Sequence, residues 1–181
     1  MSISQSRQIR KESLMKLTPD GAQKLIHSLG EERKQLIDQI NKLATFVVAV
    51  SEGDPEELRP DFDFSATVDA IRSIDDRIRK IKHARNVFNT TTLLPEENIT
   101  VDEALVLMAT LNNNYGYFAD LGNRQPKTRN RTQYKGEIEY TYTNYNIEEA
   151  KKLGRDMYER ILELQSKLNL VNSTYNFDIN L

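Results

Sequence analysis

The densest group of chemically useful side chains in this sequence lies between Gly122 and Gly136. Five cations and no acid fall within this polar segment, although the formal net charge of the whole chain is only -2. One guanidinium group can donate two parallel hydrogen bonds to a phosphate or a carboxylate, so the segment is typical of an anion-binding site. The five cations are Arg124, Lys127, Arg129, Arg131 and Lys135.

Tyrosines are interleaved with these cations and follow them along the chain. A tyrosine ring stacks on a nucleobase, so this combination suits an anion that contains a base better than it suits bare phosphate. The alternative interpretation is a solvated loop whose cations neutralise nearby acids such as Glu137, Glu139 and Glu148–Glu149. Under the first interpretation, the predicted ligand-binding residues are Arg124, Lys127, Arg129, Arg131, Tyr134, Lys135, Tyr140 and Tyr142.

The rest of the chain contains no pattern that indicates catalysis or a metal site. His27 and His83 lie on different predicted helices, and a metal site usually needs three or more ligands. Adjacent acids on a helix point about 100° apart, so they do not converge as an acid–base pair. Phosphate-loop, dinucleotide, zinc-protease and nucleophile-elbow motifs are all missing from the sequence. We therefore predict no catalytic residue, no metal, no cofactor and no enzymatic activity.

The composition restricts the cellular compartment and the binding partners that we expect for this protein. The 181 residues include no Cys, which excludes disulfides and suits a reducing compartment. The first residues hold no apolar run of the signal-peptide kind, and the longest apolar run, Phe46–Val50, is too short to cross a bilayer. The small net charge argues against general binding to nucleic acid. We expect a cytoplasmic protein, or one in the host cytoplasm if a phage encodes it, with no membrane partner.

The cationic segment interrupts a series of amphipathic helices. Apolar residues spaced by three and four predict helices over about 18–51, 64–90, 100–121 and 147–171. Period-two alternation over 137–143 predicts a strand whose partner lies within 127–134, so that 122–145 forms a basic loop and hairpin. Residues 1–17 are expected to be a short helix or a flexible tail.

These elements predict a mainly α fold: an antiparallel bundle of long helices, with coiled-coil packing and one β-hairpin inserted between the last two long helices. Residues 18–181 are expected to form a single helical domain. A narrow seam of Ile71, Ile74, Ile78 and Ile81 predicts a helix–helix contact. A monomer of this size would cover several such seams poorly, so we expect a homo-oligomer.

Four short motifs occur in order along the chain. They are RNVFNTTT at 85–92, TVDEAL at 100–105, a basic linker that leads into GEI at 136–138, and LQSKLN at 164–169 followed by NST at 172–174. In this order they resemble the septicolysin-like family, small helical bacterial proteins of largely uncharacterised function. The chain departs from that family at Leu107–Met108, where members often carry Arg-Asp. The resemblance implies a helical fold and oligomerisation, but no particular chemistry.

Two functional hypotheses follow. In the first, hairpins of several subunits form pockets that capture a small anionic ligand of nucleotide type, as in the sponges that phages use against host nucleotide signals. The expected partners are then the chain itself and that ligand. In the second, the helices form a structural oligomer that scaffolds a protein or a single-stranded nucleic acid.

Overall fold

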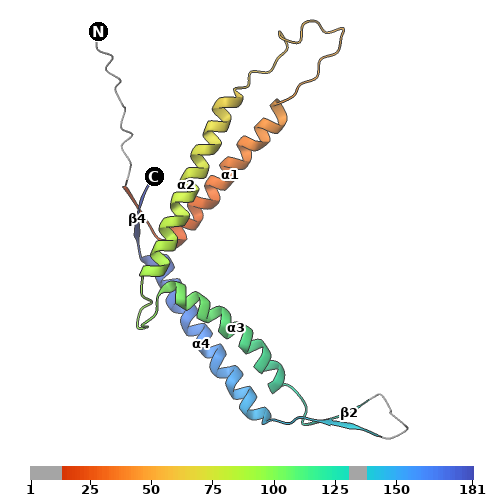
Figure 1. The fold of residues 1–181 in the computed structure, drawn as a ribbon, viewed down its shortest axis with the longest axis vertical. Helices are drawn as coiled ribbons and strands as arrows, with labels where there is room; N and C mark the ends of the chain where they lie inside the picture. The colour runs from red at the N-terminus through yellow and green to blue at the C-terminus, as the bar shows by residue number, and fades with distance from the viewer. Residues whose placement is uncertain (1–13, 131–137) are drawn as a thin grey trace. The chain divides into compact units, whose positions relative to one another are not determined.

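The computed structural model describes residues 14–130 and 138–181. Over these residues the fold is mainly α, as the sequence predicts, and it contains four helices and two pairs of short antiparallel strands (Figure 1). Where a single domain was expected, the chain divides into two compact units. Unit 1 is Met1–Phe88 with Asn172–Leu181, and unit 2 is Asn89–Val171. We attribute the division to burial, because each unit has buried apolar side chains of its own.

Unit 1 contains the helix α1, Pro19–Leu43. Its start is the predicted one: the Thr18 hydroxyl accepts a hydrogen bond from the Gly21 amide at 3.0 Å, and Pro19 occupies the first turn. The predicted end near residue 51 is wrong, because the helix stops at Leu43. The residues beyond it include β-branched Val47 and Val50, which are fully exposed, so neither propensity nor packing supports further helical turns.

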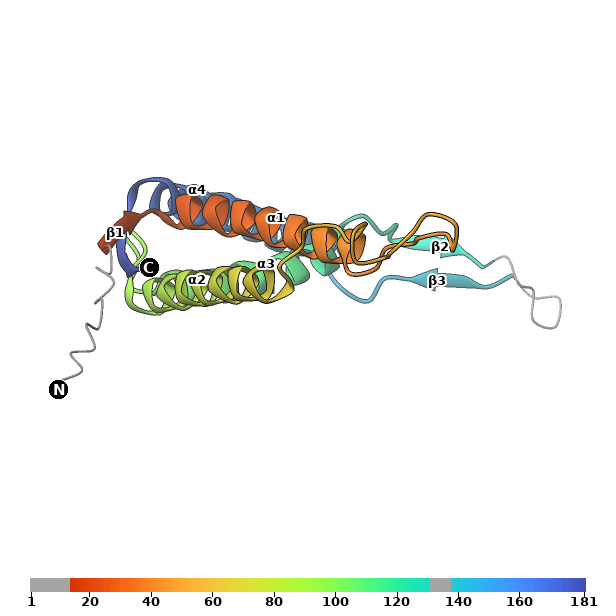
Figure 2. The same cartoon turned by 90° about the horizontal axis from the view of Figure 1, so that it is seen from above.

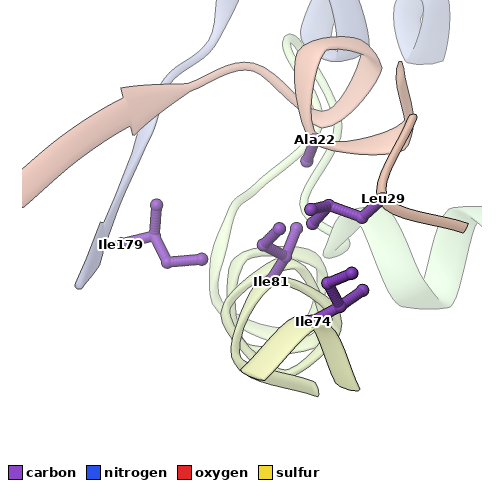
Figure 3. Close-up of a cluster of buried hydrophobic side chains, with 5 residues drawn as sticks. All are labelled: Ala22, Leu29, Ile74, Ile81 and Ile179. Atoms are coloured by element: carbon purple, nitrogen blue, oxygen red, sulfur yellow. The ribbon is translucent and has the colours of Figure 1, made fainter. Parts of the chain in front are cut away.

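The second helix, α2, spans Phe64–Thr91 and runs beside α1 in both views (Figures 1 and 2). The Asp63 carboxylate accepts a hydrogen bond from the Ala66 amide at 2.8 Å and caps its first turn. The isoleucine seam is a helix contact, as predicted. Its buried members join α1 and the C-terminal strand in one core, formed by Ala22, Leu29, Ile74, Ile81 and Ile179 (Figure 3).

The N-terminal prediction needs correction where the structure describes it. Residues Leu14–Leu17 form a strand, β1, and not a helix or tail; residues 1–13 lie outside the described part of the chain. The strand pairs antiparallel with β4, Phe177–Asn180, so that Met15 stands opposite Ile179. Leu17 and Phe177 pack against the unit 1 core, and this burial explains why the two ends pair.

Unit 2 contains α3, Val101–Gly122, and α4, Ile147–Thr174, whose last three residues belong to unit 1. A capping box begins α3: the Glu103 amide donates to the Thr100 hydroxyl at 3.2 Å, and the Thr100 amide donates to the Glu103 carboxylate at 2.7 Å. At the start of α4 the Asn146 side chain accepts from the Glu148 amide at 3.0 Å. Both helices therefore begin where their sequence indicates.

The two helices of unit 2 lie side by side (Figure 1), and their backbones come very close at Gly122. A Cβ atom on Gly122 would lie 2.8 Å from Cγ and 3.1 Å from Cα of Lys151. One turn further along α4, a Cβ on Gly154 would meet the Ala119 backbone at 3.6 Å, which is ordinary contact. Glycine is thus required at the first position and merely tolerated at the second.

An ion network attaches the 92–100 connection to α4. The Glu97 carboxylate accepts from both Nη1 and Nη2 of Arg160 at 2.8 Å and from Lys167 Nζ at 2.8 Å. Glu97 and Lys167 are both largely shielded from solvent. Hydrogen bonds from Arg160 and then Lys167 lower the pKa of Glu97 to about 2. The connection is therefore held by a carboxylate that stays ionised through the whole neutral range.

Candidate functional site

The predicted hairpin between α3 and α4 is present. Strand β2, Lys127–Arg129, pairs antiparallel with β3, Tyr140–Tyr142, and in the register Lys127 stands opposite Tyr142 and Arg129 opposite Tyr140. Directly opposed residues share a face of a sheet, and alternate residues do too. The pairing therefore gathers Lys127, Arg129, Tyr140 and Tyr142 on one side, which we call the cation–tyrosine face.

Within this face the Lys127 ammonium lies against both rings. Its Nζ is 3.9 Å from the centroid of the Tyr140 ring and 5.3 Å from that of Tyr142. The two ring centroids are 6.4 Å apart, with the planes inclined by 51°. Exposed contacts of this cation–π kind contribute about 0.5–1 kcal/mol each. Since 43% of Tyr140 and 63% of Tyr142 remain exposed, each ring still offers surface to a ligand.

Among the described residues, the opposite face of the hairpin is polar and uncharged apart from one acid, Glu139. The Thr141 hydroxyl donates to the Asn130 side-chain oxygen at 2.7 Å. The backbone amide of Asn130 donates to the backbone carbonyl of Glu139 at 2.9 Å. By strand alternation Glu139 falls on this side, away from the cations. Glu139 therefore lies on the other side of the sheet and does not neutralise the cation–tyrosine face.

A hollow of about 290 Å³ opens at the base of the hairpin. Our prediction included Arg124 and Tyr142 from its lining but missed the neutral members. Period-two alternation does not identify Thr128 and Thr141 as site residues, because it places both on the face opposite the cation–tyrosine face. The full lining is Arg124, Gln125, Thr128, Thr141, Tyr142, Thr143, Asn144 and Tyr145.

Arg124 differs from the two other described cations of the segment, Lys127 and Arg129, because it forms an ion pair with an acid. Its Nη2 lies 3.0 Å from Oδ2 of Asp120, one helical turn earlier in the chain, and this hydrogen bond raises the pKa of Arg124. The cation group is therefore not entirely free of acidic partners, because Asp120 lies just before the segment that begins at Gly122. Nearby, the Tyr145 hydroxyl donates to the Leu121 carbonyl at 2.8 Å and ties the hairpin exit to the end of α3.

The remaining predicted site residues, Arg131, Tyr134 and Lys135, lie outside the described residues. Of the five that are described, the structure brings Lys127, Arg129, Tyr140 and Tyr142 together, while Arg124 stands apart at the hairpin base. Within 14–130 and 138–181 no group of three or more potential metal ligands lies together. No helix in these ranges is long and apolar enough to cross a membrane.

Comparison with known proteins relates the chain to one solved fold. No family model and no curated protein matches it. The crystal structure of a functionally unknown conserved protein from Corynebacterium diphtheriae is similar, with a TM-score of 0.56 and 16% sequence identity. The similarity covers 90% of this chain and 99% of that one. It shows the fold alone, so the resemblance to the septicolysin-like family stays a prediction.

Proposed function

We propose that this chain is a non-catalytic, homo-oligomeric binding protein that captures a small anionic ligand of nucleotide type on its cation–tyrosine face. One observation carries the proposal. Two cations and two exposed tyrosine rings share one side of the hairpin, and the neighbouring acid Glu139 falls on the other. The rings can stack on a base while Arg129 binds a phosphate in bidentate fashion.

The free energy that individual contacts contribute to ligand binding favours an oligomer over a single hairpin as the binding unit. A base–aromatic stack contributes about 1–3 kcal/mol, and a hydrogen bond to a charged group about 1.5–3 kcal/mol. A micromolar dissociation constant requires about 8 kcal/mol, which one stack and one charged contact do not reach. The cation–tyrosine face is also open to solvent. A second hairpin, from another copy of the chain, would supply the missing contacts and the enclosure.

Sequestration is the simplest role for such a site. A protein that binds a nucleotide signal without transforming it lowers the free concentration of that signal, which is how a phage-encoded sponge would act against a host defence. This role needs many identical sites and no reactive group. It fits the hairpin, whose described side chains, apart from Pro126 and Ile138, are cations, tyrosines, hydroxyls and amides, with Glu139 as their only acid.

Titration calorimetry of the full chain against AMP, cyclic AMP and cyclic dinucleotides tests the proposal. We expect one of these to bind, and Tyr140→Ala to weaken binding by about fivefold to a hundredfold, in line with the loss of one stack. At low salt concentration, Arg129→Ala should weaken nucleotide binding more than Tyr140→Ala does. Thr128→Ala, on the opposite face of the same strand, is the matched control and should bind as the wild type does.

Two results would defeat the proposal: no nucleotide binds, or Tyr140→Ala and Arg129→Ala bind as tightly as Thr128→Ala. Light scattering gives an independent check, since a stable monomer at micromolar concentration would remove the second hairpin that the site needs.

The structural alternative also has an observation in its favour. Val106 and Tyr117 on α3, and Leu162 on α4, are more than half exposed, and exposed apolar side chains on helices serve contacts with other chains. An oligomer that scaffolds a protein would bind through such surfaces, and the hairpin would take no part in binding. If single-stranded nucleic acid were the partner, binding would fall steeply as salt concentration rises.

A further inference from the structure

A groove runs between α3 and α4 in unit 2, near the end at which the hairpin is inserted. It has a volume of about 280 Å³ and is lined by two tyrosines, two cations, an amide and two small residues. It shares no residue with the cation–tyrosine face. The lining residues are Tyr115, Ala119, Asn123, Lys151, Gly154, Arg155 and Tyr158.

The groove owes its depth to small residues at its floor. Gly154 is buried and carries no side chain, and across from it stands Ala119, whose backbone lies 3.6 Å from the position of a Cβ on Gly154. A larger residue at either position would fill the space between the helices. A cavity of about 150 Å³ holds one benzene ring, so the groove has room for a single ring and one small charged group.

Two tyrosines form one wall of the groove. The ring centroids of Tyr115 on α3 and Tyr158 on α4 lie 5.4 Å apart, with planes inclined by 32°. Tyr115 is half-buried, whereas 46% of Tyr158 is exposed, so this wall presents aromatic surface to the groove and to solvent. Aromatic rings attract one another in offset or edge-to-face arrangements, so this wall offers favourable contact to another flat ring.

The charged residues of the lining have one sign only. Lys151 and Arg155 stand four residues apart on α4, a spacing at which like charges repel, and no acid lines the groove. Lys151 Nζ contacts the exposed carboxylate of Glu148 at 2.8 Å. Among the described residues Arg155 forms no ion pair and acts on Glu148 only at longer range. An anion between the two cations would relieve their repulsion and satisfy the Arg155 guanidinium.

We propose that this groove is a binding site for a small flat aromatic molecule that carries one anionic group, with the ring against Tyr115 and Tyr158 and the anion at Arg155. The site is separate from the proposed nucleotide surface and does not depend on it. Its size excludes a dinucleotide, and its tyrosines distinguish it from a simple phosphate site.

Protein-observed NMR titration of the full chain with phenyl phosphate tests this assignment. We expect shift changes at the Tyr115, Gly154 and Tyr158 signals. Benzyl alcohol supplies the ring alone and inorganic phosphate supplies the anion alone, so each should bind at least tenfold more weakly than phenyl phosphate. Arg155→Gln should weaken phenyl phosphate binding by on the order of tenfold, because it removes a charge-assisted contact.

Lys152→Gln is the matched control, since it removes a neighbouring cation of α4 that does not line the groove. The assignment is overturned if phenyl phosphate leaves the groove signals unchanged. It is also overturned if Arg155→Gln and Lys152→Gln bind equally well. Equal binding of inorganic phosphate and phenyl phosphate would show a bare anion site and remove the aromatic part of the proposal. Tyr140→Ala should not alter any of these titrations.

Discussion

At the scale of single residues, two glycines of unit 2 stand where α3 and α4 approach each other, yet they serve different purposes. At Gly122 any side chain would meet the Lys151 backbone, because a Cβ would lie 3.1 Å from its Cα and 3.2 Å from its amide nitrogen. At Gly154 a Cβ would make only ordinary contacts with the Ala119 backbone. The first glycine therefore sets the spacing between the helices, and the second opens the groove.

Substitution of glycine by alanine is expected to have opposite effects on stability at the two positions. Gly122→Ala should destabilise the protein by about 1–3 kcal/mol, because overpacking against Lys151 outweighs the gain in helix propensity. Gly154→Ala should be neutral or stabilise it by up to about 1 kcal/mol, since alanine favours the helix and finds room. Chemical denaturation of both variants measures the difference. Equal effects at the two sites would contradict this account of the helix contact.

Residue types located the candidate site better than they described its charge. Lys127, Arg129, Tyr140 and Tyr142 were all predicted, because cations and aromatic residues stand out in an otherwise balanced chain. The pairing of Arg124 with Asp120 was missed because it joins a loop residue to the preceding helix. The groove was missed for a similar reason: Tyr115, Gly154 and Arg155 resemble ordinary helix residues until two helices are placed together.

At the scale of elements, the connection between α2 and α3 depends on one carboxylate. Glu97 reaches two cations of α4, Arg160 and Lys167, and it is the most shielded acid of the ion pairs among the described residues. Breaking a shielded pair leaves the partner cations desolvated and unsatisfied, so the cost exceeds that of losing an exposed pair. The connection therefore owes its position to charge as well as to the buried side chain of Leu94.

This arrangement predicts how stability depends on pH. The pKa of Glu97 falls from 4.5 to about 2 in the folded chain, so its contribution is complete above pH 4.5 and is lost as pH falls through about 2. Glu97→Gln should lower the melting temperature at pH 7, and the difference from the wild type should shrink between pH 4.5 and 2. Thermal melts across this range measure it. Glu148→Gln, which removes an exposed pair, should show a much smaller effect at pH 7.

Element boundaries were predictable where local residues decide them and not elsewhere. The starts of α1, α3 and α4 depend on Thr18, Thr100 and Asn146, which cap their own turns, so the sequence was sufficient. The end of α1 was placed too late because Val47 and Val50 continue an apolar spacing without any surface to cover. Strand β1 could not be foreseen, since its partner β4 lies at the other end of the chain.

At the scale of the whole molecule, the two compact units predict separable stability. Ile81 is fully buried in unit 1, and Leu164 is fully buried in unit 2. Ile81→Ala should cost about 2–5 kcal/mol and reduce amide hydrogen-exchange protection chiefly in α1 and the unit 1 part of α2. Leu164→Ala should reduce protection chiefly in α3. A uniform loss over both units in either variant would show instead that the described chain unfolds as one cooperative body.

The pairing of β1 with β4 also sets an order of events during protein synthesis. Unit 2 is one continuous stretch, so all its residues leave the ribosome before the last strand does. Unit 1 begins first but cannot be completed until Phe177–Asn180 emerge, because Ile179 belongs to its core and pairs with Met15. A nascent chain interrupted before this point keeps β1 without its partner and the unit 1 core without one of its members. Unit 1 is thus completed only after Ile179 has left the ribosome.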